Sequence, residues 1–229
     1  MKVVIFDCDG TLVDSQHGIV HSMQHAYGEV GMAFPGRERA LSIVGLSLIE
    51  AFRILEPHSD HATHAKLADA YKSSFQHMRA SKLHEEPLYE GCREVLDRLH
   101  GRDDVLLAMA TGKSQRGVRV LLEREGLEGY FQSIQTADDA PSKPHPAMIL
   151  QALADTGGRV DATVMVGDTS YDMEMARNAQ VGALGVSWGY HHDDELSGAG
   201  AHHIINHYNQ LNRFLRTGSR RRHERRDRR

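Results

Sequence analysis

Two carboxylates separated by a single residue follow the first apolar run of the chain. Residues 2–6 form a largely apolar, β-branched run that leads directly into Asp7 and Asp9. Residues two apart in an extended chain project to the same side, so the two carboxylates would lie together. Such a pair is costly unless a cation or a shared proton compensates the charge. The alternative is a solvated turn at Gly10, but the position after a buried strand favours metal-assisted or acid–base chemistry.

A second acidic motif follows another apolar run, at residues 163–166. It contains Asp168 and Asp172 and begins with Gly167. Oxygen ligands without an accompanying histidine or cysteine favour Mg²⁺ over zinc. On its own, this motif is equally compatible with an N-cap for the helix that follows. Paired with Asp7 and Asp9, it indicates a magnesium site.

Two further segments carry residues suited to binding phosphate. Thr111 and Gly112 follow the apolar run 105–110, and they offer a hydroxyl and free backbone N–H groups at the start of a helical pattern. Lys143 lies between Pro141 and Pro144, which hold the local backbone extended, and a fixed lysine there can neutralise a phosphate. Each signal is weak alone, because threonine is also a common cap and an isolated surface lysine is usually inert. The two segments gain weight from the acidic motifs.

These motifs sit where strand-like runs end and helical patterns begin. Buried-strand runs occur at residues 2–6, 105–110, 133–136, 163–166 and 183–187, and helical patterns occur at 92–99, 115–125, 147–156 and 171–179. The alternation predicts right-handed crossovers and a parallel sheet covered on both faces, which is a doubly wound α/β fold. In such a sheet the ligand site lies beyond the carboxyl ends of the strands.

The alternation is interrupted after the first strand. Between about residues 15 and 84 no strand-like run occurs, and apolar residues recur at helical spacing, as at Ile19, Met23 and Tyr27. Asp60 is a suitable N-cap for a later helix in this stretch. We therefore expect an α-helical cap domain at residues 15–85, inserted into an α/β domain formed by residues 1–14 and 86–215.

The charge of the chain is unevenly distributed. Residues 216–229 contain eight arginines against Glu224 and Asp227, which gives this segment a net charge of +6. Because the whole chain has a net charge of −4, the other 215 residues carry −10. An acidic body does not suggest a nucleic-acid-binding surface. A short basic terminal run is typically a solvated end, so we expect residues 216–229 to be a disordered tail.

Composition also sets expectations for location. No apolar run approaches the roughly 18 residues needed to span a membrane. The first residues lack the basic leader, apolar stretch and cleavage site of a secretory signal. Two cysteines do not make a disulfide framework, so we expect a reduced, cytoplasmic protein with no membrane partner.

The four motifs, in this order and at these strand ends, resemble those of the haloacid dehalogenase superfamily, and the inserted helical cap resembles its C1-capped subgroup. The resemblance implies that Asp7 attacks phosphorus, while Asp9 protonates the leaving oxygen and then activates water. It implies that Thr111, Gly112 and Lys143 hold the phosphoryl oxygens. It further implies that Mg²⁺ is bound by Asp168, Asp7 and the main-chain carbonyl of Asp9, with Asp172 supporting the metal shell.

Within the superfamily, Asp9 favours phosphate-ester hydrolysis, because a halide leaving group needs no proton. The segments 9–15 and 185–190 are similar to those of phosphoglycolate phosphatases, which implies a small phosphorylated metabolite as substrate. A sugar-phosphate phosphatase, a nucleotidase, a pyrophosphatase and a phosphomutase of the β-phosphoglucomutase type stay open as alternatives. A non-catalytic binding protein that uses the arginine-rich tail is the alternative from a different class, and the presence of both Asp7 and Asp9 opposes it.

Overall fold

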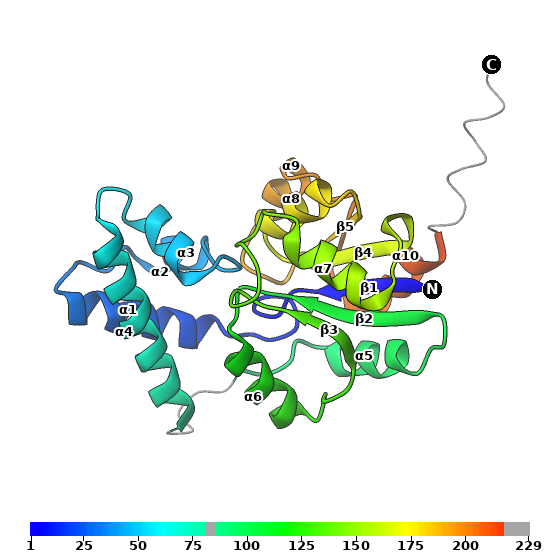
Figure 1. The fold of residues 1–229 in the computed structure, drawn as a ribbon, viewed down its shortest axis with the longest axis horizontal. Helices are drawn as coiled ribbons and strands as arrows, with labels where there is room; N and C mark the ends of the chain where they lie inside the picture. The colour runs from blue at the N-terminus through cyan, green and yellow to red at the C-terminus, as the bar shows by residue number, and fades with distance from the viewer. Residues whose placement is uncertain (81–85, 218–229) are drawn as a thin grey trace, which may run out of the picture.

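The predicted parallel sheet is confirmed. The computed structural model describes residues 1–80 and 86–217, and within them six strands form one parallel sheet in the order β3-β2-β1-β4-β5-β6 (Figure 1). The strands are β1 Lys2–Phe6, β2 Val105–Ala110, β3 Phe131–Gln135, β4 Thr163–Gly167, β5 Gly182–Val186 and β6 His203–Ile205. The strand order reverses beside β1, so the first strand of the chain lies at the centre of the sheet.

Helices cover both faces of the sheet because both faces are apolar. Val4 and Phe6 of β1 point to one face, and Val3 and Ile5 point to the other; all four are fully buried. The first face is covered by α5 Cys92–His100, α6 Gln115–Glu125 and α10 Leu211–Thr217. The second is covered by α7 Ala147–Thr156, α8 Ser170–Asn178 and α9 Asp193–Gly198. Short 3₁₀ turns occur at Val160–Ala162 and Tyr208–Gln210, and Tyr208 packs in the core of the first face.

The helices inserted after β1 have a hydrophobic core of their own. They are α1 Gln16–Val30, α2 Arg37–Leu41, α3 Leu48–Leu55 and α4 His61–Ala80. Met23, Phe52 and Leu67 are at most 1% exposed and belong to a cluster separate from the two that flank the sheet. In Figure 1 these helices lie at one end of the molecule, beyond the carboxyl ends of the strands and away from the N-terminus. A separate core supports the proposed division into a cap domain and an α/β domain.

Several elements were absent from the sequence prediction because they are short. The strand β6 contains three residues, and α2, α3, α9 and α10 have between five and eight residues each. Such lengths give too few repeats for a periodic pattern to emerge. By contrast, Asp60 accepts a hydrogen bond from the N–H of Thr63 at 2.8 Å at the start of α4, as a capping residue should.

Two further observations concern the C-terminal helix and the possibility of a membrane-spanning helix. The helix α10 extends to Thr217, two residues past the predicted end of the α/β domain, and the rest of the arginine-rich tail, residues 218–229, lies outside the described residues. Within the described ranges, no helix combines the length and the apolar character required to cross a membrane.

Candidate active site

Three buried carboxylates meet at the carboxyl edge of the sheet. Asp7 follows β1, Asp168 follows β4, and Asp172 lies in the first turn of α8. The N–H of Asp7 donates to the carbonyl of Val166 at 2.9 Å, which continues the pairing of β1 with β4. One carboxylate oxygen of each acid lies within 4.8 Å of the others, and each residue is at most 1% exposed. Among the described residues, this is the acidic group that could hold a cation.

Lys143 bridges two of these acids through its ammonium group. Its Nζ lies 2.8 Å from Oδ1 of Asp7 and 2.6 Å from Oδ1 of Asp172, and the residue is 2% exposed. Burial acts to lower the pKa of Lys143, but the two carboxylates outweigh it and hold that pKa above its ordinary value. The lysine is therefore charged at neutral pH, and its ammonium lies where it can neutralise an anion beside Asp7.

The acidic group carries more negative charge than Lys143 can balance. Burial raises the pKa of Asp7 to about 7, although Lys143 opposes the shift, and burial also raises the pKa of Asp168 well above its ordinary value. Oδ2 of Asp7 accepts no hydrogen bond from any described residue, despite being buried. An all-oxygen group with excess charge and an unsatisfied oxygen fits a hard divalent cation.

Asp168 is held from two sides. Thr11 Oγ1 donates to its Oδ1 at 2.7 Å, and the N–H of Tyr190 donates to its Oδ2 at 3.0 Å. The chain approaches this side chain so closely that only glycine fits beside it. A Cβ on Gly10, where φ is +83°, would lie 2.1 Å from Oδ2 of Asp168, and a Cβ on Gly189 would lie 2.1 Å from its Cβ.

Aromatic side chains fix the turn that carries Thr11. The indole Nε1 of Trp188 donates to the carbonyl of Thr11 at 3.1 Å, and the hydroxyl of Tyr208 donates to the same oxygen at 2.6 Å. The rings of Trp188 and Tyr208 are 4.7 Å apart between centroids. The turn after β1 is thus tied to the far end of the chain.

Asp172 both caps α8 and faces Lys143. Its Oδ2 accepts hydrogen bonds from the N–H and the hydroxyl of Thr169, at 3.1 and 2.7 Å, in a capping box. Its other oxygen contacts Lys143. The sequence left a choice between a cap and a ligand for this motif. Thr169 is the N-cap residue, so Asp168 is not used as the cap.

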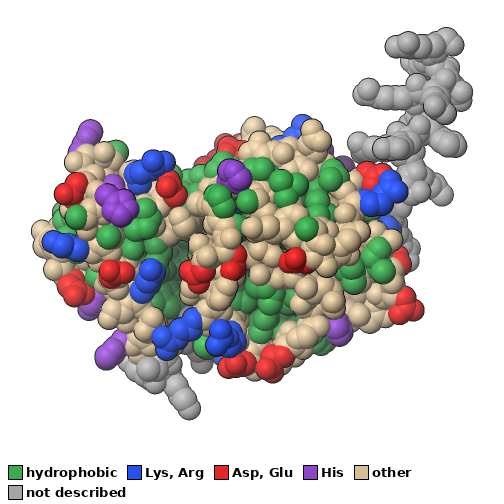
Figure 2. All heavy atoms as spheres, viewed as in Figure 1, with side chains coloured by type: hydrophobic (Ala, Val, Ile, Leu, Met, Phe, Trp, Pro, Cys, Tyr) green, Lys and Arg blue, Asp and Glu red, His purple; other side chains and the backbone are tan. Residues whose placement is uncertain are grey.

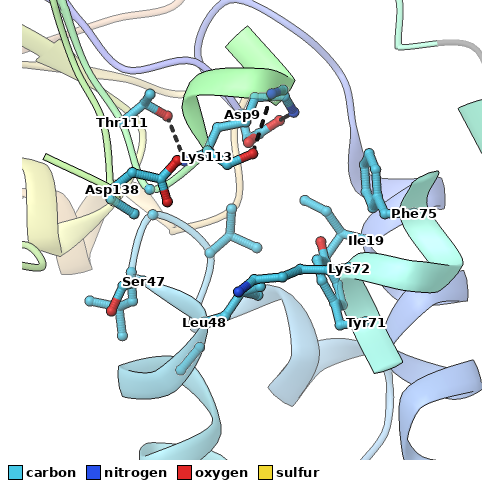
Figure 3. Close-up of a pocket in the computed structure, with 18 of the residues that line it drawn as sticks. Asp9, Ile19, Ser47, Leu48, Tyr71, Lys72, Phe75, Thr111, Lys113 and Asp138 are labelled. Atoms are coloured by element: carbon cyan, nitrogen blue, oxygen red, sulfur yellow. Dashed lines mark hydrogen bonds and ion pairs between the residues drawn. The ribbon is translucent and has the colours of Figure 1, made fainter. Parts of the chain in front are cut away.

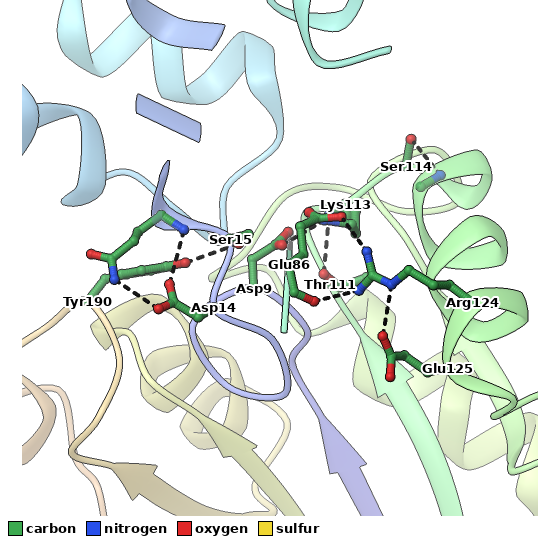
Figure 4. A network of polar contacts seen from close by, with 12 residues as sticks. Asp9, Asp14, Ser15, Glu86, Thr111, Lys113, Ser114, Arg124, Glu125 and Tyr190 are labelled. Atoms are coloured by element: carbon green, nitrogen blue, oxygen red, sulfur yellow. Dashed lines mark hydrogen bonds and ion pairs between the residues drawn. The ribbon is translucent and has the colours of Figure 1, made fainter. Parts of the chain in front are cut away.

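Asp9 points away from the acidic group and toward a different lysine. Lys113 Nζ donates to Oδ1 of Asp9 at 2.7 Å and to Oε1 of Glu86 at 3.1 Å. Arg124 lies 3.6 Å from the other oxygen of Glu86, which is 2% exposed (Figure 4). The carboxylate of Asp9 is therefore held apart from Asp7, and the predicted metal contact through its main-chain carbonyl stays a prediction.

The predicted phosphate-binding segment lies at the floor of a cavity of about 470 Å³. Thr111 and Gly112 line this cavity together with Asp7 and Asp9 (Figure 3). Gly112 also supports the cap, since a Cβ there would lie 2.7 Å from the carbonyl oxygens of Gly45 and Leu46. The loop before α3 is thus packed directly against the floor.

Polar contacts hold the same cap loop on the α/β domain. The N–H of Ser47 donates to Oγ of Ser142 at 2.8 Å. The carbonyl of Ser42 lies 3.0 Å from Nε2 of His191 and accepts a hydrogen bond from the hydroxyl of Tyr171 at 3.3 Å. The cap is therefore docked, and the cavity is enclosed by both parts of the chain.

Sequence reasoning missed several residues of this site. Three of them are direct sequence neighbours of residues in the predicted motifs: Thr11 follows Gly10, Lys113 follows Gly112 and Ser142 precedes Lys143. This adjacency was the signal that could have identified them. Glu86 had no such signal, because Lys113 and Arg124, which contact it, lie far along the chain, after β2 and in α6. The predicted residues Asp7, Asp168, Asp172 and Lys143 are brought together, while Asp9, Thr111 and Gly112 line the cavity above them.

Comparisons with known proteins agree with this architecture. Residues 4–186 match the sequence model of the haloacid dehalogenase-like hydrolase family. The chain is 37% identical over 214 residues to “Probable phosphatase IndB” of Dickeya dadantii (91% of each chain) and 34% identical over 193 residues to a phosphoglycolate phosphatase of Agrobacterium fabrum (82% of this chain, 81% of the relative). A crystal structure of a predicted phosphatase from Clostridium acetobutylicum superposes with a TM-score of 0.82 at 27% identity, covering 93% of this chain and 97% of that one.

Replacing Asp7 by asparagine is expected to stabilise the metal-free protein at pH 8. The pKa of Asp7 rises from 3.8 to about 7 on folding. Between these values the folded state binds more protons than the unfolded chain, so wild-type stability falls as the pH rises through this window. We expect Asp7→Asn to melt at least about 2 °C above the wild type at pH 8, the shift for roughly 1 kcal/mol in a chain of this size, and to gain less at pH 5.

Differential scanning fluorimetry in chelated buffer measures this gain, with Asp69→Asn, an exposed aspartate on α4, as the control that should not shift. Equal melting temperatures at pH 8, or a gain that does not depend on pH, would contradict the electrostatic account of the site.

Gly189→Ala is expected to cost about 1–3 kcal/mol of stability and to weaken the binding of a divalent cation, because its new Cβ would overlap Cβ of Asp168 at 2.1 Å. Urea unfolding and the Mg²⁺-dependent rise in melting temperature measure the two effects. Gly198→Ala is the matched control, since no atom lies within 4 Å of its Cβ position at the end of α9. Similar behaviour of the two variants would show that close packing at Gly189 is unimportant.

Proposed function

Because the chain belongs to the haloacid dehalogenase-like hydrolase family, we propose that it is a Mg²⁺-dependent phosphatase that hydrolyses a small phosphomonoester through a phosphorylated Asp7. The observation that carries the proposal is the environment of Asp7. Its carboxylate is buried at the floor of the cavity, it keeps an oxygen without a hydrogen bond, and it lies beside Lys143 and two further acids. The phosphoglycolate phosphatase among the relatives makes phosphoglycolate the reference substrate.

In the first step, an oxygen of Asp7 attacks phosphorus, and the bond between phosphorus and the ester oxygen breaks. Asp9, which enters this step in its protonated form, gives its proton to the departing alcohol oxygen, and the carboxylate that is left pairs with Lys113. In the second step, Asp9 removes a proton from a water molecule that attacks the same phosphorus, which releases inorganic phosphate and restores Asp7. A nucleophile and an acid–base group with separate surroundings suit these two roles, and Asp7 and Asp9 face different lysines.

The charge on the transferred group is balanced by Lys143 and by the hydroxyl and N–H groups near Thr111. Mg²⁺, held by Asp7 and Asp168 with Asp172 close by, would reduce the repulsion between the carboxylate and the phosphate dianion. The raised pKa of Asp7 applies to the acidic group without a bound cation. A divalent cation lowers that pKa, so the attacking carboxylate is ionised when the metal is in place.

Lys113 is assigned the role of a positioning residue for Asp9. Its ammonium lies between Asp9 and Glu86, and only 7% of its side chain is exposed. This ion pair holds the carboxylate of Asp9 over the cavity and away from the acidic group. Without it, Asp9 would be free to turn toward the cation site, where it could not serve the leaving oxygen.

Asp7→Asn is expected to abolish Mg²⁺-dependent hydrolysis while the protein stays folded, since an amide cannot form the phosphoryl ester. Turnover of p-nitrophenyl phosphate measures activity, and intact-mass spectrometry of acid-quenched wild-type protein should detect one added phosphoryl group. Asp69→Asn controls for loss of an unrelated aspartate and should keep full activity. An Asp7→Asn protein with wild-type turnover would refute the mechanism.

Lys113→Met is expected to lower kcat/KM, which reports the steps up to phosphorylation of Asp7, by about 10²-fold for an alkyl phosphate and by much less for p-nitrophenyl phosphate. An alkoxide needs a proton from Asp9 to leave, whereas p-nitrophenolate does not. Comparing kcat/KM for the two substrates, with Lys113→Arg as the conservative variant that should recover part of the loss, tests the positioning role. An equal loss on both substrates would indicate that Lys113 acts otherwise.

A further inference from the structure

The cavity above Asp7 is much larger than the acidic floor requires. Its volume of about 470 Å³ lies within the range of sites that bind drug-sized ligands. The floor is formed by the strand ends, and the walls come from α1, α3, α4, α6 and the loop before α3 (Figure 3). A phosphoryl group and a two-carbon acid would occupy only the lower part of this space.

The interior of the walls is apolar. The cap contributes Ile19, Met23, Val44, Leu48, Tyr71 and Phe75. Of these, Ile19, Met23, Val44 and Phe75 are at most 8% exposed. Figure 2 shows hydrophobic side chains in the hollow between the two parts of the molecule, with lysine and arginine side chains near one edge of it.

Above the floor, the polar lining residues lie mainly at the mouth of the cavity. Lys72, Gln76, Ser114 and Arg116 line the cavity and are all exposed. Sugar hydroxyls buried against the apolar walls would lose their hydrogen bonds to water, and each unsatisfied group would cost about 1–3 kcal/mol. An apolar substituent would instead gain from the same burial.

The two lysines nearest to Asp7 and Asp9 already form ion pairs with carboxylates. Lys113 contacts Asp9 and Glu86, and Lys143 contacts Asp7 and Asp172. At the floor, the carboxylate of phosphoglycolate would have to compete with these acids for Lys113 or Lys143, and the cationic lining residues Lys72 and Arg116 lie at the mouth. A neutral apolar substituent makes no such demand.

From these observations we infer that the preferred substrate is a phosphomonoester of a bulky, apolar alcohol with a ring-sized group, a class that the cap walls select. The inference rests on the proposed function, because the phosphoryl group must sit over Asp7. The apolar group then lies among Leu48, Tyr71 and Phe75, and its burial excludes water from the reacting phosphorus until the alcohol leaves.

The test uses the full chain with Mg²⁺ and two alkyl esters with similar leaving groups, ethyl phosphate and cyclohexylmethyl phosphate. Phosphoglycolate, glucose 6-phosphate and a nucleoside 5′-monophosphate serve as competing classes. We expect kcat/KM for cyclohexylmethyl phosphate to exceed that for each of the other four by at least about 10-fold, since a single buried methylene contributes roughly 10–200-fold.

A pair of variants on one helix links the preference to the cap wall. Leu48→Gln places an amide in the cavity and should reduce the ratio of kcat/KM between cyclohexylmethyl and ethyl phosphate by at least about 10-fold. Ile54→Gln is the matched control, because Ile54 belongs to the same helix α3 but is 48% exposed and outside the cavity lining. It should leave the ratio unchanged.

The outcomes separate the two proposals. If p-nitrophenyl phosphate and all five esters fail to react with Mg²⁺, the phosphatase proposal is wrong and the inference falls with it. If p-nitrophenyl phosphate is hydrolysed but phosphoglycolate, the sugar phosphate or the nucleotide is the best substrate, only the apolar preference is overturned. An unchanged ratio in Leu48→Gln would likewise overturn it.

Discussion

The structure depends on placing three carboxylates and one ammonium in a buried site. Asp7, Asp168, Asp172 and Lys143 are almost completely excluded from solvent. Burying a surplus of negative charge is costly unless every oxygen finds a partner. Thr11 and Tyr190 donate to Asp168, and Thr169 donates to Asp172. Among the three, Asp7 keeps a buried oxygen, Oδ2, that accepts no hydrogen bond from any described residue, so stability is sacrificed at the residue proposed to react.

Close packing follows from the same constraint. The segments around the acids must approach them without side chains, which explains glycine at positions 10, 167 and 189. Gly112 extends the principle to the cap, since its lack of a side chain lets the loop at Gly45 rest on the cavity floor. The proposed phosphate-binding segment and the cap loop at Gly45 therefore form one packed unit, so a change in either would be transmitted to the other.

Much of the fold could be predicted because its signals are local. The strand Lys2–Phe6 and the helix Gln115–Glu125 have the predicted bounds, since each has a clear apolar period and a distinct start. The acids could be identified because each follows a strand, and parallel strands end at one edge.

Other parts of the site depend on contacts that a linear pattern does not encode. The ion pair between Lys113 and Asp9 joins residues 104 positions apart, and the partner Glu86 stands outside every motif. The size and apolar character of the cavity arise from four helices and a loop that meet only after folding. Specificity is therefore less visible in the sequence than chemistry, because the chemistry is carried by a few residues and specificity by a surface.

The ties on the turn after β1 have a practical consequence. Trp188 is the only tryptophan of the chain, and its indole N–H donates to the carbonyl of Thr11, whose side chain in turn donates to Asp168. Two hydrogen bonds, joined through Thr11, thus connect the indole of Trp188 to the proposed cation site. Its emission provides an intrinsic optical reporter, so occupancy of the site can be followed in unlabelled protein, without a substrate and without turnover.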